Sequence, residues 1–364
     1  MHKRLTGCLL LFVATGCDVA GGEDPLDSGI PAVGDPDGGE ISVDVGGDPP
    51  DAGGSPGDAD PGPTLAERIA AATQTAETQA ACASAVLPEG FYWEIGDRDG
   101  MLASGSIRGS NTPTPSQVIA IASASKWVYS TYVLEKVGSR RESDVPFLNF
   151  TSGMVFPLSA RSKDVLCGAN ETVGECAADA VEQASSVGNF HYSAGHFQVH
   201  AANTMGLGNL RAAELSAELN SVLGTLDFTY LQTNLAGGLN TSATAYAAFL
   251  RRLLRGEYVL SDHLGDDKVC ASSACLVGEA LSPAPPDEAW NYSLGHWVED
   301  DPTVGDHAFS SAGALGFYPW IDQTETWYGV VARRAAAPGG NQGVVSLRCG
   351  RLIRQAWVTG QAVR

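Results

Sequence analysis

The chain has 364 residues, of which 42 are acidic and 22 are basic, so its formal charge at pH 7 is −20. An apolar fraction of 44% is typical of a globular protein that buries a core. This acidity disfavours a nucleic-acid-binding function, because phosphate binding needs clustered positive charge. No apolar run approaches the roughly 18 residues of a membrane span.

Residues 1–17 are predicted to be a leader segment. Lys3 and Arg4 precede a short apolar stretch, and small residues follow up to Cys17. This order resembles the processing site of bacterial lipoproteins, in which the cysteine becomes the lipidated N-terminus. We therefore expect an exported protein of the cell envelope, periplasmic or on the cell surface, that meets the membrane only through a lipid on Cys17. Ordinary signal-peptidase cleavage nearby is the alternative.

Residues 18–63 are predicted to be a disordered linker. Gly, Pro and acidic residues make up 32 of the 47 residues between 17 and 63. Such a stretch cannot bury enough apolar surface to offset the entropy lost on ordering. It contains a G-x-S-x-G match at 53–57, but that elbow requires a strand before it and a helix after it, and neither is predicted here.

The folded domain is predicted to cover residues 64–364. A capping box formed by Thr64 and Glu67 opens a helix that reaches about residue 84. Further elements follow in chain order: strands at 91–95 and 101–107, a helix at 123–137, a mixed region at 140–290 with a strong helix at 244–255, strands at 290–298, 308–317 and 326–332, and a closing amphipathic helix at 342–358. This order suggests one two-lobed domain, with strands at both ends and helices inserted between them.

Ser123 and Lys126 form an S-x-x-K motif at the start of a predicted helix. Residues three apart share one helix face, so the hydroxyl and the amine can meet. A lysine kept from water loses proton affinity and can act as a base. Taken alone, however, the motif fits a capping serine and a surface lysine better than a catalytic pair.

Two further motifs follow in the chain, at residues 190–197 around Tyr192 and at residues 311–317 around Gly313. The order and spacing of the three motifs resemble the serine β-lactamase and penicillin-recognising family, especially its class C and family VIII esterase branch. Residues 151–153 and 237–242 add secondary resemblances, and the likeness covers essentially the whole folded part.

The resemblance implies a fold and roles. The fold is α+β and β-lactamase-like: an antiparallel sheet flanked by the terminal helices, with an all-helical lobe inserted at about 138–290. Ser123 corresponds to the nucleophile, Lys126 to its base and Tyr192 to the proton shuttle, although Tyr192 could instead be a core tyrosine. Backbone N–H groups of Ser123 and Ala314 correspond to the oxyanion hole, with Ser311 and Gly313 beside it at the substrate site.

Three positions depart from the family pattern. Ala194 replaces the amide of Y-x-N, and Ser311 and Ala312 replace the Lys-Thr or His-x pair of the third motif. Loss of that cation weakens attraction for an anionic substrate. Arg333 or Arg334 could compensate, but alternation along a strand allows at most one to point inward. We expect both to be solvated surface charges.

Histidines 191, 196 and 200 raise the question of a metal site. His196 and His200 are four residues apart, but no glutamate completes an H-E-x-x-H pattern. We therefore predict no metal, and His191 and His196 are expected to line the cleft because they flank Tyr192. The chain has no G-x-G-x-x-G and no P-loop, so no cofactor is expected.

The predicted function is serine hydrolysis through an acyl-enzyme, acting on a small ester or amide. A D-Ala-D-Ala carboxypeptidase or a β-lactamase is the alternative within the same chemistry, with a small-molecule or peptide substrate. A non-catalytic surface binding module with a degraded hydrolase site is the alternative of another class. Ala194, Ser311 and Ala312 favour that module, whereas the intact Ser123 and Lys126 oppose it.

Six cysteines lie in the predicted domain, and an even number in an exported chain favours disulfides over free thiols. Spacing alone leaves fifteen pairings open. The resemblance places the first and last helices side by side, which implies a Cys82–Cys349 bridge. It also implies two short loops in the inserted lobe, Cys167–Cys176 and Cys270–Cys275.

Overall fold

The structure is a computed structural model that describes residues 62–335 and 342–364. The predicted leader, its lipidation site Cys17 and nearly all of the predicted linker lie outside the described residues. Within the described part, none of the helices combines the length and the apolar character that crossing a membrane requires.

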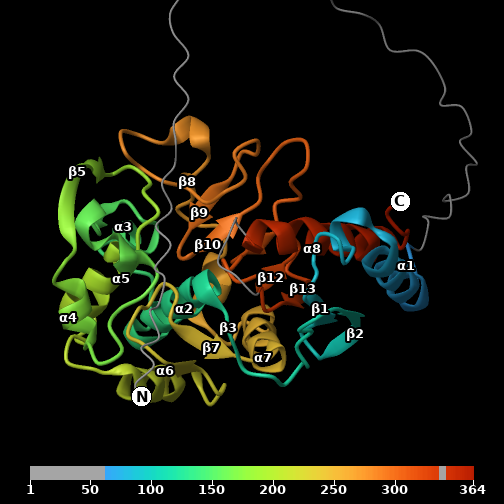
Figure 1. Ribbon diagram of the computed structural model, residues 1–364, viewed down its shortest axis with the longest axis horizontal. Helices are drawn as coiled ribbons and strands as arrows, with labels where there is room; N and C mark the ends of the chain where they lie inside the picture. Colours follow the sequence, from blue (N-terminus) through green and yellow to red (C-terminus); the bar gives the residue numbers. More distant parts are fainter. Residues whose placement is uncertain (1–61, 336–341) are drawn as a thin grey trace, which may run out of the picture. The chain divides into compact units, whose positions relative to one another are not determined.

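An eight-stranded antiparallel sheet forms the centre of the domain (Figure 1), with the strand order β2-β1-β13-β12-β11-β10-β9-β8. Strands from the two ends of the chain therefore lie side by side, as the α+β prediction required. The strands are β1 (Gly90–Asp97), β2 (Met101–Arg108), β8 (Val269–Cys270), β9 (Asn291–Ser293), β10 (His296–Val298), β11 (Phe309–Ser310), β12 (Tyr318–Ile321) and β13 (Trp327–Ala332).

The terminal helices α1 (Leu65–Thr78) and α8 (Gln342–Thr359) pack against each other beside this sheet (Figure 1). Arg68 of α1 donates hydrogen bonds to the carbonyl oxygens of Trp357 and Val358, at 2.7 and 2.9 Å. These are among the last carbonyls of α8, which have no partner within the helix. One side chain thus fixes the start of the domain to its end.

Helix α7 (Ala243–Leu254) covers the other face of the sheet. Neighbouring residues of β13 point to opposite faces of the sheet. Tyr328 contacts α7, because its hydroxyl accepts a hydrogen bond from Arg251 at 2.8 Å, whereas the Trp327 ring packs against Trp357 of α8. β13 is therefore covered on both faces, which explains its continuous apolar run. Helix α2 (Ser125–Val137) lies deepest, with all of its residues from Ser125 to Leu134 buried.

The inserted region holds α3 (Val145–Leu148), α4 (Val173–Ala177), α5 (Gly195–Val199) and α6 (Ala212–Leu223). It also holds strands that the all-helical prediction missed. β4 (Ser152–Val155) pairs with β5 (Val181–Val187), and β6 (Thr229–Tyr230) pairs with β7 (Leu239–Thr241), which also pairs with β3 (Ile119–Ala120) from before α2. Pairing satisfies the backbone groups of these short segments, which carry too little apolar periodicity for a helix.

Three element boundaries differ from the sequence-based prediction. The predicted strand at 290–298 is a hairpin, because Leu294 and Gly295 both take positive φ, at 38° and 83°, and reverse the chain between β9 and β10. The predicted strand at 308–317 ends at Ser310, since the N–H of Gly313 donates to the Phe317 carbonyl at 2.7 Å and closes a turn. The first helix ends at Thr78, and a 3₁₀ turn, Ala80–Cys82, follows.

Three disulfides join the pairs that the family resemblance implied. Cys82–Cys349, Cys167–Cys176 and Cys270–Cys275 have Cα separations of 4.9, 5.7 and 5.9 Å. The first connects the end of the N-terminal helical segment to α8 across 267 residues. Cys270 lies on β8, so the third bridge is at an edge of the main sheet and not in the inserted lobe.

Candidate active site

Ser123 lies in a 3₁₀ turn, Ala122–Ala124, that leads directly into α2. The residue before it, Ala122, has φ of 47°, a left-handed conformation that costs free energy for a residue with a Cβ atom. This bend precedes the N-terminal end of α2, where the first N–H groups have no intrahelical acceptor. Lys126 follows one turn later, with its Nζ atom 3.0 Å from Ser123 Oγ.

Lys126 is 4% exposed, and its amine also donates to the carbonyl oxygen of Ala236 at 2.7 Å. Burial lowers the pKa of this amine from 10.5 to about 7, and the charge of Asp164 opposes that effect. A substantial neutral fraction is therefore present near neutral pH. The neutral amine can take the Ser123 proton across the short contact between them.

Tyr192 is the third group that the structure brings to this point. The Lys126 amine lies 4.6 Å from the centre of its ring, and Tyr192 and Ser123 line the same cleft. Burial raises the pKa of the phenol above its usual value of 10, so the hydroxyl is protonated near neutral pH. Trp297 stacks on the ring at 5.6 Å with an interplanar angle of 18° and so fixes its orientation.

The third motif approaches Ser123 from the turn between β11 and β12. A Cβ atom on Gly313 would overlap the carbonyl oxygen of Ile121, so only glycine allows this turn to lie so close to the serine segment. Ser311 is buried, and its hydroxyl donates to the carbonyl oxygen of Ser123 at 3.2 Å. Ala314 is exposed and lies on the wall of the cleft.

A cleft of about 510 Å³ opens over Ser123 and Tyr192. Its walls are mainly apolar and aromatic, with two charged side chains among them. The lining comprises Ser123, Arg161, Asp164, Val165, Tyr192, Leu281, Ser282, Pro283, Ala284, Trp290, Trp297, Ala312, Ala314 and Val344. A larger pocket of about 950 Å³ lies against α8 and is lined by neither Ser123 nor Tyr192, so we place the site in the smaller cleft.

The arginines are arranged differently from the prediction. Arg333 is fully buried, with Nε 3.9 Å from the Glu89 carboxylate, so its assignment as a solvated charge was wrong. Arg334 is exposed, as expected, and neither residue lines the cleft. The arginine that does line the cleft is Arg161, which is exposed and belongs to no recognised motif.

The histidines do not line the cleft, contrary to expectation. His196 is fully buried, with Nδ1 2.7 Å from Ser152 Oγ and Nε2 3.0 Å from the His191 carbonyl oxygen. Burial lowers its pKa to about 3, so the ring is neutral. His200 is buried between the Tyr129 hydroxyl and Asp144. Both rings are therefore buried structural groups on the segment that follows Tyr192, and neither faces the cleft.

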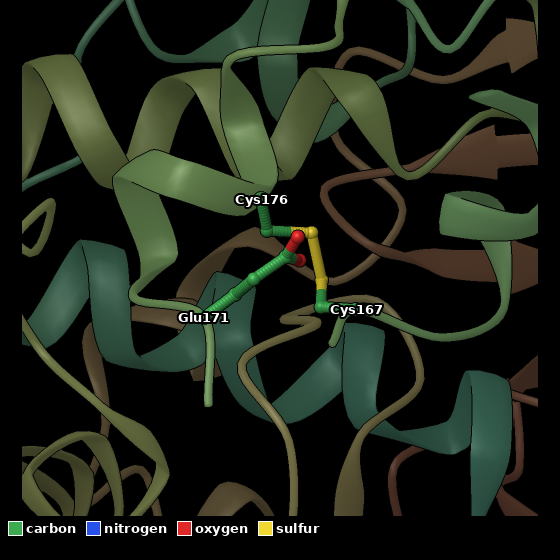
Figure 2. A group of neighbouring side chains, drawn as sticks. All are labelled: Cys167, Glu171 and Cys176. Atoms are coloured by element: carbon green, nitrogen blue, oxygen red, sulfur yellow. A yellow bond between two sulfur atoms is a disulfide. The ribbon is translucent and has the colours of Figure 1, made fainter. Parts of the chain in front are cut away.

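One group of potential metal ligands occurs in the described part of the chain: Cys167, Glu171 and Cys176 (Figure 2). Its two sulfur atoms are joined in a disulfide, so neither is a thiolate ligand. The Glu171 carboxylate accepts hydrogen bonds from Lys163 and from the N–H of Gly168, at 3.0 and 2.8 Å. The group is therefore a structural bridge with a neighbouring ion pair.

Asp164 is a cleft residue that the sequence analysis missed. It ends the 3₁₀ segment Leu158–Asp164, and its Oδ1 atom accepts from Ser193 Oγ at 2.7 Å and from the Ala194 N–H at 2.8 Å. No spacing rule connects it to Tyr192, because the contact depends on the path of the inserted region.

No family model and no curated protein sequence matches the chain. Several solved structures, however, are similar to the chain. The chain is similar to D-amino acid amidase from Ochrobactrum anthropi SV3 complexed with L-phenylalanine amide, with a TM-score of 0.55 and 13% identity over 80% of this chain and 98% of that one. It is also similar to EstCE1, a hydrolase with promiscuous acyltransferase activity, with a TM-score of 0.52 and 13% identity over 81% of this chain and 98% of that one.

A third similar structure is the octameric penicillin-binding protein homologue from Pyrococcus abyssi, with a TM-score of 0.51 and 12% identity, over 82% of this chain and 76% of that one. At such identities the likeness establishes the fold. The domain has the β-lactamase-like fold, an antiparallel sheet with helices on both faces, which the sequence resemblance implied.

Proposed function

We propose that the protein is a serine hydrolase that works through an acyl-enzyme on Ser123. The observation that carries this proposal is the 3.0 Å contact between the Ser123 hydroxyl and a buried lysine with a pKa of about 7. A surface lysine with a pKa near 10.5 could not serve as a base at neutral pH. A degraded binding module would have no need to keep such an amine buried beside a hydroxyl.

In the proposed reaction, neutral Lys126 takes the Ser123 proton as Oγ attacks the substrate carbonyl. The N–H groups of Ser123 and Ala314 stabilise the oxyanion, and the Tyr192 phenol donates a proton to the leaving group. Lys126 returns its proton to the tyrosine oxygen. Water then attacks the ester carbonyl of the acyl-enzyme, its proton reaches Ser123 through the same pair, and the acid product leaves.

The proposed substrate is a small neutral ester or amide. The cleft walls are mostly apolar, and Ser311 stands where a cation would favour a carboxylate. Arg161 on the cleft wall supports a second candidate, an anionic β-lactam or D-Ala-D-Ala peptide. The ratio of kcat/KM for short neutral esters to kcat/KM for penicillins decides between them, and we expect it to exceed one.

A fluorophosphonate probe tests the central proposal. We expect its mass on the peptide that contains Ser123, and no labelling of the Ser123→Ala variant with an unchanged circular dichroism spectrum. Export and lipid anchoring through Cys17 are part of the proposal and rest on the leader pattern alone. Metabolic labelling with a radioactive fatty acid tests them, and Cys17→Ala should abolish incorporation.

A further inference from the structure

Asp164 is the one carboxylate on the wall of the cleft, among the residues that the structure describes. The side chain is half-buried, and burial raises its pKa. Its Oδ1 atom already accepts two hydrogen bonds, at 2.7 and 2.8 Å, from the two residues that follow Tyr192. The carboxylate therefore lines the cleft and contacts the segment that carries the proposed proton shuttle.

These contacts fix the segment that carries Tyr192. Ser193 Oγ donates to Asp164 and accepts from the N–H of Phe156 at 3.0 Å, so one hydroxyl connects three segments of the inserted region. Ala194 is the N-cap residue of α5, and its own side chain makes no capping hydrogen bond, whereas its N–H donates to Asp164. Because Ala194 also lacks a polar side chain, the anchoring passes through Ser193 and the main chain to Asp164.

The charge of Asp164 also faces the catalytic pair. It raises the pKa of Lys126, against the larger effect of burial, and it raises the pKa of Tyr192. Arg161, on the same segment, is the other charged side chain that acts on this carboxylate. A single carboxylate thus contacts the tyrosine segment and acts electrostatically on the lysine.

We propose that Asp164 is a positioning residue of this active site, which holds the Tyr192 segment in place and supplies the negative charge opposite Lys126. The inference rests on the proposed function and adds to it a residue that belongs to no family motif quoted above. Two variants separate its two contributions. Asp164→Asn keeps an acceptor for Ser193 and Ala194 but removes the charge, whereas Asp164→Ala removes both.

For Asp164→Asn we expect the acidic limb of the kcat/KM profile to move to lower pH by at least about half a unit, because Lys126 loses the charge that favours its protonated form. The plateau should fall less than about fivefold. Asp164→Ala should show the same shift and a fall of at least about tenfold, since small displacements of catalytic groups are costly. Asp179→Asn is the matched control, because Asp179 pairs with the neighbouring Lys163 at 2.8 Å. It should leave the profile unchanged.

A measurement that does not need turnover keeps this inference separate from the proposed function. In the full chain labelled with ¹³Cε-lysine, NMR titration of five lysines reports the Lys126 pKa directly, with Lys126→Ala for assignment. A lower pKa in Asp164→Asn supports the inference even if the fluorophosphonate label maps elsewhere and the hydrolase proposal fails. An unchanged Lys126 titration, or an Asp164→Ala variant with wild-type kcat/KM, would overturn it while leaving labelling at Ser123 intact.

Discussion

The Nζ atom of Lys126 lies 3.0 Å from Oγ of Ser123, and the carbonyl oxygen of Ala236 holds it there from the other side at 2.7 Å. The two acceptors fix the amine but cannot replace the water lost on burial. Burial therefore lowers its pKa to about 7, and this makes the site suitable for base catalysis. The predictions below follow from this pair and from the elements that surround it.

Replacing Lys126 with methionine should abolish activity and stabilise the fold. A lysine with a lowered folded-state pKa binds fewer protons than the unfolded chain, so stability is lost as pH falls from about 10.5 towards 7 and stays low below that. At pH 7, Lys126→Met should raise the free energy of unfolding by roughly 2 kcal/mol. Urea denaturation measures this. Lys268→Met is the control, because Lys268 forms an exposed ion pair with Asp300, and it should change the free energy of unfolding by less than about 0.5 kcal/mol.

Tyr192→Phe removes the proposed proton donor while keeping the ring that stacks on Trp297. We expect kcat/KM to fall by about 10²–10⁴ with little change in stability. Tyr129→Phe is the matched control, because the Tyr129 hydroxyl contacts buried His200 and lies outside the cleft. If both variants retained full turnover, Tyr192 would be a core residue only.

Gly313→Ala should separate the third motif from the serine segment. The added methyl group would overlap the Ile121 carbonyl oxygen, so the turn that carries Ala314 must move away. A shift of about 1 Å at the oxyanion position is expected to lower kcat by about tenfold or more. Gly100→Ala, where a Cβ atom meets nothing within 4 Å, should leave kcat unchanged.

The spacing and order of the motifs were sufficient to predict that Ser123, Lys126 and Tyr192 lie together. Ser123 and Lys126 meet since residues three apart share a helix face. The hairpin at Leu294 was missed because a leucine with positive φ breaks the usual preference for glycine or asparagine in such turns. Apolar and polar residues alternate from Trp290 to Leu294, so the segment looked like one strand.

The surroundings of a side chain could not be predicted from the sequence where they are formed by segments distant in the chain. Arg333 is buried because Glu89 and Gln342 lie beside it, and these residues come from opposite ends of the domain. The surroundings of Asp164 were equally unpredictable, because its partners lie about 30 residues further along the chain and no sequence pattern connects them to it. The motifs pointed to the candidate reacting groups, whereas Asp164, which contacts the Tyr192 segment, could be found only from the fold.

Removing the Cys82–Cys349 bridge should be the most costly disulfide change. The bridge closes a loop of 267 residues, and loop entropy predicts a loss of about 5–6 kcal/mol, a figure that depends on the model used. The double variant Cys82→Ala/Cys349→Ala should therefore have a clearly lower Tm. Cys270→Ala/Cys275→Ala, which opens a loop of only 5 residues, should lower it much less. Equal losses would contradict the entropic argument.

The rate of acylation as a function of pH tests the central claim most directly. With a neutral ester and stopped-flow detection of the leaving group, the rate should rise with pH along a single acidic limb with a midpoint near 7, where Lys126 becomes neutral. The same midpoint should appear in the ¹³Cε-lysine titration of Lys126. An acylation rate that is flat from pH 5 to 9, or a Lys126 amine that titrates near 10.5, would contradict the account.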